Sequence, residues 1–548
     1  MKSRALTCIT AITLLAALAI PVRLAAQEQK EGKEHHRYKL VDIGTFGGPE
    51  SNVNPAVNAG PIVSRQGTTV GASATSVPTS SHSHPFVCGG LDGTVPFVFH
   101  GFRWQEGGVT DLGALPPATD NCSEAQGVNA RGEIVLQSEN GVIDPVTGIN
   151  EIRGVLWKNG KLGDLGTFGG NNSLANQINN RGQIAGAALN TIPDPFSVYY
   201  FLFLRSSNGT QTRAFLWENG HMEDLGTLGG PDAVATFVNE RGQVAGASYT
   251  NSTPNPATGV PTLDPFLWTK DKGMIDLGSL GGTLAGPNAL NNRGQVIGTS
   301  NLAGDQASDP FLWDDGKLID LFTDTVGGNP VTADAINDAG EIVGQAVFSS
   351  QFKHAYLRRN GTATDIGTVD GDDCSWAHAI NSRGQVVGQS YACDGSTGHT
   401  FLWEDGSIVD LNSLISSESN LQLVDAQAIN DRGEIAGDGL PPGCPLLPGD
   451  AKCGHAFVLI PCDREHSDEG GCEGEGETGL AIQNSRVPIN QSRANVMGIG
   501  LTPGEIAAGM RARLGSATSM EFEGSERSLA PSLLLFQHDF VPDRSSRR

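Results

Sequence analysis

The sequence predicts an all-β protein built from tandem copies of one short four-stranded unit. Two markers recur along the chain: an Asn followed three residues later by Gly, and the tripeptide Asp-Leu-Gly or a variant of it. The Asp residues of the second marker come as close as 44 residues, from Asp276 to Asp320, which matches the length of a four-stranded propeller blade. No stretch of the repeat region shows convincing helical periodicity.

Within one unit the strands follow each other in a fixed order. In "SWAHAINSRGQVVGQS" (residues 375–390), two β-rich runs are joined by "NSRG". Its Asn can cap the turn and its Gly can adopt a positive φ, which predicts a hairpin with a bulge. After a variable loop, "HTFLW" and "SIVDL" follow, joined by "EDG". Sister units have "ENG" or "KNG" here, and Asn-Gly between apolar runs is a strong hairpin signal.

The two markers place eight units along the chain. The first marker begins at Asn129, Asn179, Asn239, Asn291, Asn337, Asn381 and Asn430, and a stretched eighth copy is predicted from Asn58 to Gly67. The second marker begins at Asp42, Asp111, Asp164, Asp224, Asp276, Asp320, Asp365 and Asp410.

The two ends of the repeat array predict a closed ring. The chain begins with a lone fourth strand, Tyr38–Gly44, and ends with a unit of only three strands, the last being "HAFVLI". Pairing the lone strand with the incomplete unit completes the last blade and hides the sheet edges. We therefore predict a β-propeller of eight four-stranded blades over residues 38–462, with seven blades as the alternative count.

The repeated tripeptides carry a family resemblance. His455-Ala456-Phe457 and its variants, together with "FLW", "DLGTLGG" and "INxRGQVVG", resemble the HAF-repeat family of bacterial extracellular proteins over residues 38–462. The chain departs from the pattern at Asp309-Pro310-Phe311, which replaces the tripeptide, and in "DLFTDTVGG". The resemblance implies export and a repeat fold. It implies no activity.

The N-terminus and the composition point to an extracytoplasmic protein. Residues 1–26 read as a signal peptide, with Lys2 and Arg4 before an apolar run and small residues before Gln27, followed by a linker over residues 27–37. The formal charge of −24 disfavours nucleic acid and anionic lipid as partners, and no other apolar run could span a membrane. We expect a secreted or periplasmic monomer.

The C-terminal part differs in composition from the repeats. Residues 463–500 are predicted to form an acidic, Gly-rich linker, with seven acids against one Arg in residues 463–477. Residues 501–515 have the signature of a short amphipathic helix, with Thr502 as its cap and Ile506, Met510 and Leu514 on one narrow face. Residues 516–548 are expected to be a disordered tail.

The repeated polar residues do not form a catalytic or metal-binding set. The tripeptide histidines, His100, His354, His399 and His455, belong to the third strands of separate blades and cannot converge on a metal. The Asp of the second marker is expected to accept hydrogen bonds from nearby backbone N–H groups. No cofactor is predicted. The one candidate cation is Ca²⁺ in "DGDDC", at Asp370, Asp372 and Asp373, although the spacing differs from that of a calcium-binding loop.

Three residues before each turn Asn, the innermost strand carries a polar residue in seven of eight units. These candidate ligand-binding residues are Gln126, Asn176, Thr236, Asn288, Asp334, His378 and Gln427, with Pro55 in the first unit. They predict a ring of amides and hydroxyls near the mouth of the central channel, suited to a polyol, sugar or peptide. The alternative is that each side chain bonds to the next blade and is purely structural.

Six cysteines are expected to pair on the face formed by the loops between second and third strands. The candidate disulfides are Cys374–Cys393, Cys444–Cys453 and Cys88–Cys122, which leaves Cys462 and Cys472. The long insertions at residues 74–98, 187–212 and 248–263 lie in the same class of loops, where recognition usually resides.

These observations favour a non-enzymatic binding or scaffold module for an extracellular glycan, peptide or protein. The first alternative is a hydrolase or lyase centred on Asp334 and His378 at the channel mouth. The second is a passive structural component of the cell envelope. The fold alone does not choose among them.

Overall fold

A computed structural model describes most of the repeat region. The described residues are 36–53, 61–84, 87–88, 96–117, 119–199, 209–256, 258–348, 352–394, 397–444 and 453–462. The predicted signal peptide, nearly all of the N-terminal linker, Pro55, and the predicted linker, helix and tail beyond Cys462 lie outside these residues. Within the described chain, no helix has the length and apolar character needed to cross a membrane.

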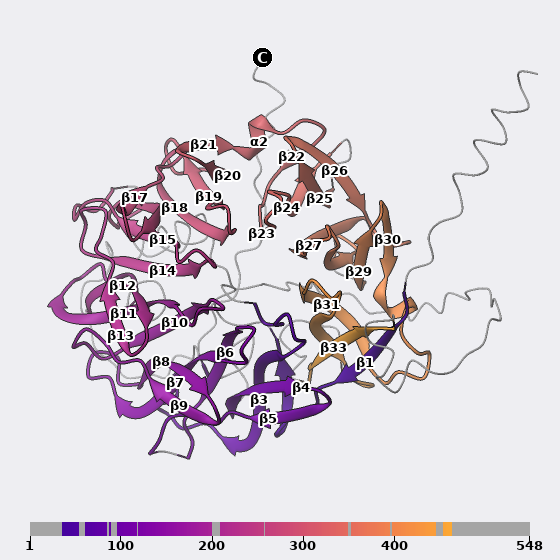
Figure 1. Cartoon of the computed structure of the whole chain (residues 1–548), viewed down its shortest axis with the longest axis horizontal. Helices are drawn as coiled ribbons and strands as arrows, with labels where there is room; N and C mark the ends of the chain where they lie inside the picture. The colour runs from indigo at the N-terminus through magenta and orange to yellow at the C-terminus, as the bar shows by residue number, and fades with distance from the viewer. Residues whose placement is uncertain are drawn as a thin grey trace, which may run out of the picture.

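The strands form an eight-bladed β-propeller closed by the predicted N-terminal strand. Each blade is a four-stranded antiparallel sheet, and a single bridge between Leu263 and Leu284 links two neighbouring blades. Strand β1 (Tyr38–Asp42) pairs antiparallel with β33 (His455–Pro461), with Tyr38 opposite Pro461 and Asp42 opposite Phe457. Figure 1 shows the indigo β1 lying beside the last orange strands. The eight-blade count is confirmed.

The first four blades follow one another around half of the ring (Figure 1). Blade 1 consists of β2 (Gly47–Asn52), β3 (Thr69–Pro78), β4 (Phe97–Gln105) and β5 (Gly108–Asp111). Blade 2 consists of β6 (Ser123–Val128), β7 (Ile134–Ile143), β8 (Asn150–Lys158) and β9 (Lys161–Asp164). Blade 3 consists of β10 (Ser173–Ile178), β11 (Ile184–Pro193), β12 (Thr210–Glu218) and β13 (His221–Asp224). Blade 4 consists of β14 (Ala233–Val238), β15 (Val244–Tyr249), β16 (Leu263–Thr269) and β17 (Gly273–Asp276).

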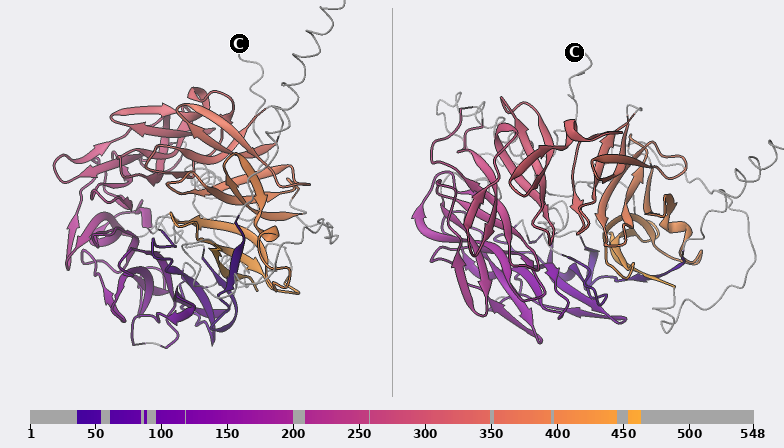
Figure 2. Two further views of the ribbon diagram at one scale, coloured as in Figure 1. Left: turned by 45° about the vertical axis from the view of Figure 1, so that its right-hand side comes forward. Right: turned by 45° about the horizontal axis from the view of Figure 1, so that its top comes forward.

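The other four blades complete the ring, and the tilted views of Figure 2 show them as separate sheets. Blade 5 consists of β18 (Gly281–Leu290), β19 (Val296–Leu302), β20 (Ser308–Asp314) and β21 (Lys317–Asp320). Blade 6 has a divided inner strand, β22 (Asn329–Pro330) and β23 (Ala335–Ile336), then β24 (Ile342–Val347), β25 (Lys353–Arg359) and β26 (Thr362–Gly367). Blade 7 consists of β27 (Cys374–Ile380), β28 (Val386–Tyr391), β29 (Gly398–Glu404) and β30 (Ser407–Asp410). Blade 8 consists of β31 (Gln422–Ile429), β32 (Ile435–Leu440), β33 and β1.

Short helical turns replace the glycine of the second marker in two blades. The helix α2 (Leu321–Asp324) and the 3-10 helix η3 (Leu411–Ser413) follow Asp320 and Asp410, whose side chains accept hydrogen bonds from the first free backbone N–H groups. The same Asp side chain therefore caps either a glycine turn or a helical turn.

The core lies inside and between the blades, where the third strand contributes its aromatic residue. Phe215, Phe266, Phe311, Phe401 and Phe457 are all fully buried, and each contributes about 1.5–3 kcal/mol relative to an exposed side chain. The second strand places a glycine against the aromatic ring of the third-strand residue.

Gly186 illustrates why the glycine is needed. A Cβ at this position would clash with the carbonyl oxygen of Leu174 and with the ring of Phe215. Close approach to a buried phenylalanine thus explains the glycine of "GA" in the second strands of blades 3 and 4, Gly186 and Gly246.

A ring of asparagines joins the blades at the turn that follows each inner strand. The Oδ1 of Asn291 accepts hydrogen bonds from the backbone N–H groups of Arg293 and Gln295, both at 3.0 Å, and its Nδ2 donates to the backbone oxygen of Asn337 in the next blade at 3.0 Å. An amide offers the acceptor and the donor on two separate atoms, the oxygen and the nitrogen. We call the set the asparagine ring: Asn129, Asn179, Asn239, Asn291, Asn337, Asn381 and Asn430.

The turn predicted at Asn58 in blade 1 is wrong. Asn430 donates to the backbone oxygen of Ser64 at 2.8 Å, and the Oγ of Ser64 accepts from the N–H groups of Gln66 and Thr68. Ser64 therefore occupies the position of the turn Asn, with Gly67 three residues later. A hydroxyl can replace the acceptor half of the amide, so the Asn-to-Gly spacing alone misplaced the turn.

Candidate functional site

The polar residues of the inner strands occupy β-bulges. The pairing between first and second strands shifts at Gln126, Asn176, Thr236, Asn288, His378 and Gln427, each of which is skipped in the register. In blade 6, Asp334 lies in the gap between β22 and β23. A bulge bends the strand and re-aims the extra side chain. The spacing of three residues before the turn thus predicted a real structural position, although the sequence did not indicate the bulge.

In two blades the bulged residue joins its blade to the next. The Nδ2 of Asn176 donates to the backbone oxygen of Ala235 at 2.8 Å, and that of Asn288 donates to the backbone oxygen of Ala333 at 3.0 Å. Both acceptors belong to the inner strand of the following blade. These two amides therefore have the structural role that the sequence left open as the alternative. Gln126 is fully buried, and Thr236 is half-buried.

In blades 6, 7 and 8 the same position belongs to a cluster of ionisable groups. The carboxylate of Asp334 accepts hydrogen bonds from Thr332 Oγ1 at 2.5 Å and from Trp376 Nε1 at 2.8 Å. The ring of His378 lies 5.0 Å from that of Trp376, and its Nε2 lies 3.3 Å from Oδ1 of Asp425. The predicted neighbours Asp334 and His378 thus belong to one cluster, connected through Trp376 from the same strand as His378.

Blade 8 adds two carboxyl groups that face each other across a strand pair. Asp425 on β31 lies directly opposite Asp438 on β32, whereas the same pair in blade 3 is Leu174 and Ala187. Gln427 donates to Oδ2 of Asp425 at 2.5 Å, and Asp438 accepts from the backbone N–H of Val53 at 3.1 Å. Two acids placed opposite each other are destabilising if both are ionised. We call Asp334, Trp376, His378, Asp425 and Asp438 the acidic sector.

Burial and mutual repulsion alter the protonation of this sector. Burial raises the pKa of Asp438 to about 8, and the nearby charges of Asp425 and Glu50 add to the effect. Burial also raises the pKa of Asp334. Burial disfavours the imidazolium of His378, but the adjacent carboxylate of Asp425 more than compensates and the pKa of His378 is raised. At neutral pH, Asp438 is therefore mainly protonated.

The acidic sector is not arranged as a metal site. In the described chain, only two sets of three ligand atoms lie within 4.8 Å of one another: Cys88–Cys122–Glu139 and Asp373–Cys374–Cys393. Both include a disulfide, so their sulfur atoms are not free thiolates.

The predicted calcium residues make contacts within the protein. Asp372 accepts from Thr397 Oγ1 at 2.6 Å and lies 2.8 Å from Nδ1 of His399, while Asp373 accepts from the backbone N–H of Cys393 at 2.6 Å. Asp370 is exposed. A calcium site at these residues remains a prediction.

The tripeptide histidines stay apart, as predicted. His100, His354 and His455 each place Nδ1 about 3 Å from the Asp of the second marker, with distances of 3.0, 3.0 and 2.9 Å. Arg213 makes the same contact with Asp224 in blade 3. The Asp side chain also accepts from the backbone N–H two residues later, as Asp365 does from Gly367 at 2.8 Å. These pairs fasten the outer strand to the third strand.

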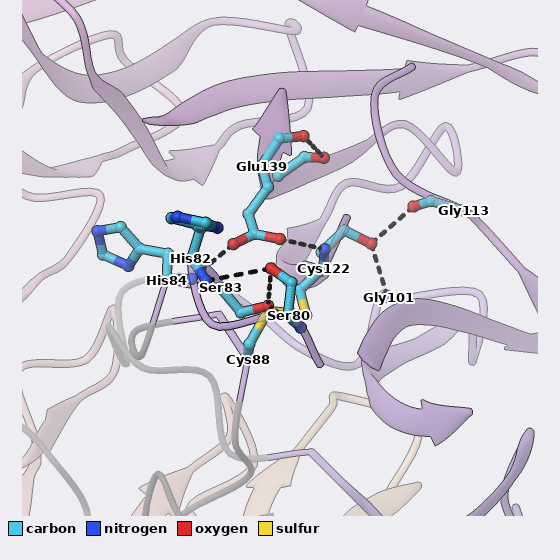
Figure 3. The surroundings of a disulfide bond; sticks show 11 residues. Ser80, His82, Ser83, His84, Cys88, Gly101, Gly113, Cys122 and Glu139 are labelled. Atoms are coloured by element: carbon cyan, nitrogen blue, oxygen red, sulfur yellow. Dashed lines mark hydrogen bonds between the residues drawn. A yellow bond between two sulfur atoms is a disulfide. The ribbon is translucent and has the colours of Figure 1, made fainter. Parts of the chain in front are cut away.

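Three disulfides brace the opposite face, and they are the three pairs proposed from the sequence: Cys88–Cys122, Cys374–Cys393 and Cys444–Cys453. Around the first pair, the carboxylate of Glu139 accepts from the backbone N–H groups of Cys122 at 2.7 Å and His84 at 2.5 Å. Figure 3 shows Glu139 between these two residues. Cys462 is also disulfide-bonded.

The long insertions contact one another on this face. The Nε2 of His84 lies 3.4 Å from the hydroxyl of Tyr199, and the hydroxyl of Tyr249 donates to the backbone oxygen of Phe196 at 3.1 Å. Asp232 accepts from the backbone N–H groups of Val198 and Thr212, at 2.5 and 2.9 Å. Burial and the neighbouring Asp194 raise the pKa of Asp232 to about 8. The described parts of the insertions are thus packed together, which sequence patterns could not show.

A separate surface groove of about 540 Å³ lies on the third and fourth strands of blade 2, beside the third strand of blade 3. Its lining includes Leu162, Leu165, Lys161 and Trp217. None of its lining residues belongs to the acidic sector, so we do not assign the candidate site to it.

Comparison with known proteins supports no particular activity. No family model and no curated protein matches the chain. The β-propeller domain of the Trilobed protease from Pyrococcus furiosus is similar at 10% identity, with 60% of this chain and 89% of that one covered and a TM-score of 0.36. A puromycin-hydrolysing peptidase of Mycobacterium tuberculosis has 11% identity, with 74% and 62% covered and a TM-score of 0.36.

A third similar structure, a fungal alcohol oxidase of the AA5 family in complex with copper, has 10% identity, with 78% of this chain and 77% of that one covered and a TM-score of 0.35. Similarities at this level carry no argument about function. The assignment of this chain to the β-propellers rests on its own strand pairing.

Proposed function

We propose that the protein is an exported, non-enzymatic binding module that recognises the amine or guanidinium group of an extracellular peptide or protein in the acidic sector. The observation that carries the proposal is a cluster of Asp334 from blade 6, His378 from blade 7, and Asp425 and Asp438 from blade 8, in which Nε2 of His378 lies 3.3 Å from Oδ1 of Asp425. Among the described residues, no Lys or Arg forms an ion pair with these three acids.

The chemistry of the sector suits an organic cation better than a metal ion. Its ligand atoms are too far apart to surround a single ion, as their absence from the compact three-ligand sets of the described chain indicates. An ammonium or guanidinium group can instead bond to one carboxylate while it contacts the Trp376 indole. Export is supported by the disulfides, because such bonds persist in oxidising compartments.

The first test is thermal melting of the full chain with N-acetyl-arginine amide, N-acetyl-lysine amide and, as neutral probes, glucose and N-acetyl-alanine amide. A ligand at 100 times its Kd adds about 2.7 kcal/mol to the free energy of unfolding, so a saturable rise in Tm is expected for the two cations only. Asp425→Asn should abolish the rise. An equal rise with the neutral probes, or a rise that survives Asp425→Asn, contradicts the proposal.

The second candidate function is a hydrolase or lyase, and one observation favours it. Asp438, protonated at neutral pH, faces the carboxyl group of Asp425 across one strand pair, and catalysis often uses a protonated acid beside an ionised group. Turnover of chromogenic glycosides, esters or peptides that disappears in Asp438→Asn would support it. If no probe shifts the melting curve and no substrate turns over, a passive envelope component is the remaining function.

A further inference from the structure

A belt of arginines surrounds the ring axis at the turns that carry the asparagine ring. In six blades the residue before the turn glycine is an arginine, and in blade 1 Arg65 lies one residue earlier than that. We call this set the arginine belt: Arg65, Arg131, Arg181, Arg241, Arg293, Arg383 and Arg432. All of them are exposed except Arg432, which is half-buried.

Five belt arginines reach over the turn of the next blade: Arg131, Arg181, Arg241, Arg293 and Arg383. The guanidinium of Arg131 lies so close to Gly182, and that of Arg181 so close to Gly242, that a Cβ at either glycine would clash. Arg293 donates from Nη1 to the backbone oxygen of Ala339 at 3.0 Å. These five guanidinium groups therefore lie against the turn of a neighbouring blade rather than pointing freely into solvent.

Part of the belt has no acidic partner. Arg131 pairs with Glu133 at 2.5 Å, Arg432 with Glu434 at 3.5 Å and Arg65 with Asp431 at 3.5 Å. In the described chain, no ion pair is formed by four other members: Arg181, Arg241, Arg293 and Arg383.

Acids in the same turns are bonded elsewhere. Glu240 accepts from Asn180 and Asp338 from Asn292, both in the preceding blade. A protein with a formal charge of −24 thus presents, on one face of the described chain, four arginines that form no ion pair, and an anionic chain would be attracted to them.

The described chain ends on this same face. Strands β31 and β33 are both antiparallel to β32, so β33 ends on the side where β31 enters its turn. Pro461 packs against Gly433: a Cβ there would lie 3.5 Å from Pro461 Cγ and 2.7 Å from Arg383 Nη2. The last strand therefore ends beside the belt arginine Arg383.

The residues that follow are strongly acidic. Residues 463–477 contain seven acids and one Arg. We propose that residues 463–477 bind in cis to the arginine belt, from Arg383 toward the other arginines without ion pairs. This contact is independent of the function proposed for the acidic sector, because it involves the turn face and not the bulged residues.

Arginine-specific labelling of the full chain tests the proposal. Phenylglyoxal modification, quantified at each arginine by mass spectrometry in low salt, is compared between the natural chain and a variant with the seven acids of residues 463–477 replaced by their amides. We expect Arg181, Arg241, Arg293 and Arg383 to react about three- to tenfold faster in the variant, as several weak ion pairs together predict. In the natural chain, 0.5 M NaCl should have the same effect.

Arg213 serves as the internal control, because its partner is Asp224 on an outer strand; its rate should be the same in both chains. Arg293→Glu gives a second measurement: it should increase the rate of trypsin cleavage after Arg464, while the melting temperature reports that the propeller is still folded. Equal labelling rates in the two chains overturn the proposal. Protection that depends on protein concentration also overturns it, since the occupant would then be a second copy.

Discussion

Two rings of side chains, three residues apart on the inner strands, behave in opposite ways. At the turn, the asparagine ring repeats one residue type and one set of contacts from blade to blade. At the bulge, the blades differ: Asn176 and Asn288 bond to the next blade, whereas His378 contacts Asp425 and Asp334 accepts from Trp376.

The difference separates two kinds of constraint within one repeat. The turn position must supply an acceptor for two backbone N–H groups and a donor to the next blade, so its chemistry is fixed by geometry. The bulge position must only avoid an unsatisfied polar group. It is therefore free to carry an amide or a hydroxyl in most blades and an ionisable group in blades 6 and 7, and that freedom is what makes the acidic sector a candidate site.

The largest effect is expected at the turn position. Asn291→Ala removes an acceptor of two backbone N–H groups and a donor to Asn337, and should lower the free energy of unfolding by about 3 kcal/mol. Urea unfolding followed by tryptophan fluorescence measures the change.

Ser64 provides the matched control for this prediction. Its hydroxyl already replaces the acceptor half of the amide in blade 1, so Asn291→Ser should cost about half as much as Asn291→Ala. A cost near zero for Asn291→Ser would show that the contact to the next blade contributes nothing and that the asparagine ring is only turn chemistry. Equal costs for the two variants would show that a serine hydroxyl does not replace the acceptor at this turn.

The next effect is a pH dependence at Asp438. Its folded pKa of about 8 lies above the ordinary value of 3.8, so the folded state binds a proton more tightly and stability falls as the pH rises from about 4 to 8. Asp438→Asn removes this loss, and should raise the free energy of unfolding by about 2 kcal/mol at pH 8 and by nothing at pH 4. Denaturant unfolding at the two pH values measures it.

For Asp431, on the turn face, we expect the opposite dependence of stability on pH. Burial raises the pKa of Asp431, but hydrogen bonds from Ser382 and the charges of Arg65 and Arg383 together outweigh it and lower the pKa below the ordinary value. Its ionised form therefore stabilises the fold above about pH 4, and Asp431→Asn should cost a few tenths of a kcal/mol at pH 8. The same sign for both variants would mean that Asp438 is not held protonated.

A smaller effect distinguishes the bulge amides from the acidic sector. Asn176→Ala leaves the backbone oxygen of Ala235 without its donor, and should cost about 1 kcal/mol of stability. The rise in Tm caused by N-acetyl-arginine amide should be the same as in the natural chain. If that rise disappears, the whole ring of bulged residues binds the ligand, and the division between the bulge amides and the acidic sector is wrong.

The smallest effect concerns the outer strands. The hydrogen bond and charge of Asp365 raise the pKa of His354, so the pair stabilises the fold below about pH 6.5 and loses this contribution as the pH rises through the folded pKa. His354→Ala should cost about 0.5 kcal/mol at pH 5 and almost nothing at pH 9. Arg213→Ala, at the same position in blade 3, should cost the same at both pH values.

Most of the fold could be predicted from the sequence because each blade repeats the same local physics. Asn381 and Gly384 mark one hairpin turn, and the lone strand Tyr38–Asp42 finds its partner in His455–Pro461. The turn of blade 1 was mispredicted because the hydroxyl of Ser64 accepts the hydrogen bonds that an Asn side chain accepts in the other blades. A pattern built on one residue type does not detect a substitution that keeps only the acceptor.

The candidate site was predictable only in part. The spacing identified Asp334 and His378, but Trp376 and Asp425 lie two residues before a bulge, and Asp438 is on the second strand. Whether these residues lie together depends on how neighbouring blades pack against each other. The spacing of residues along the sequence gives no information about that packing. A search for carboxylates opposite each other on neighbouring strands would have found Asp425 and Asp438.

The pairing of β1 with β33 has a consequence for the order in which the molecule is made. Asp42 and His455 are in contact although 413 residues separate them. Synthesis delivers β1 at the start and its partner at the end, so blade 8 is the last to be completed and the ring stays open until then. Bringing such distant ends together is slow compared with forming a local hairpin. An unfinished chain therefore exposes the sheet edges of β1 and of the newest blade, and only the final residues of the repeat region convert a row of blades into a closed molecule.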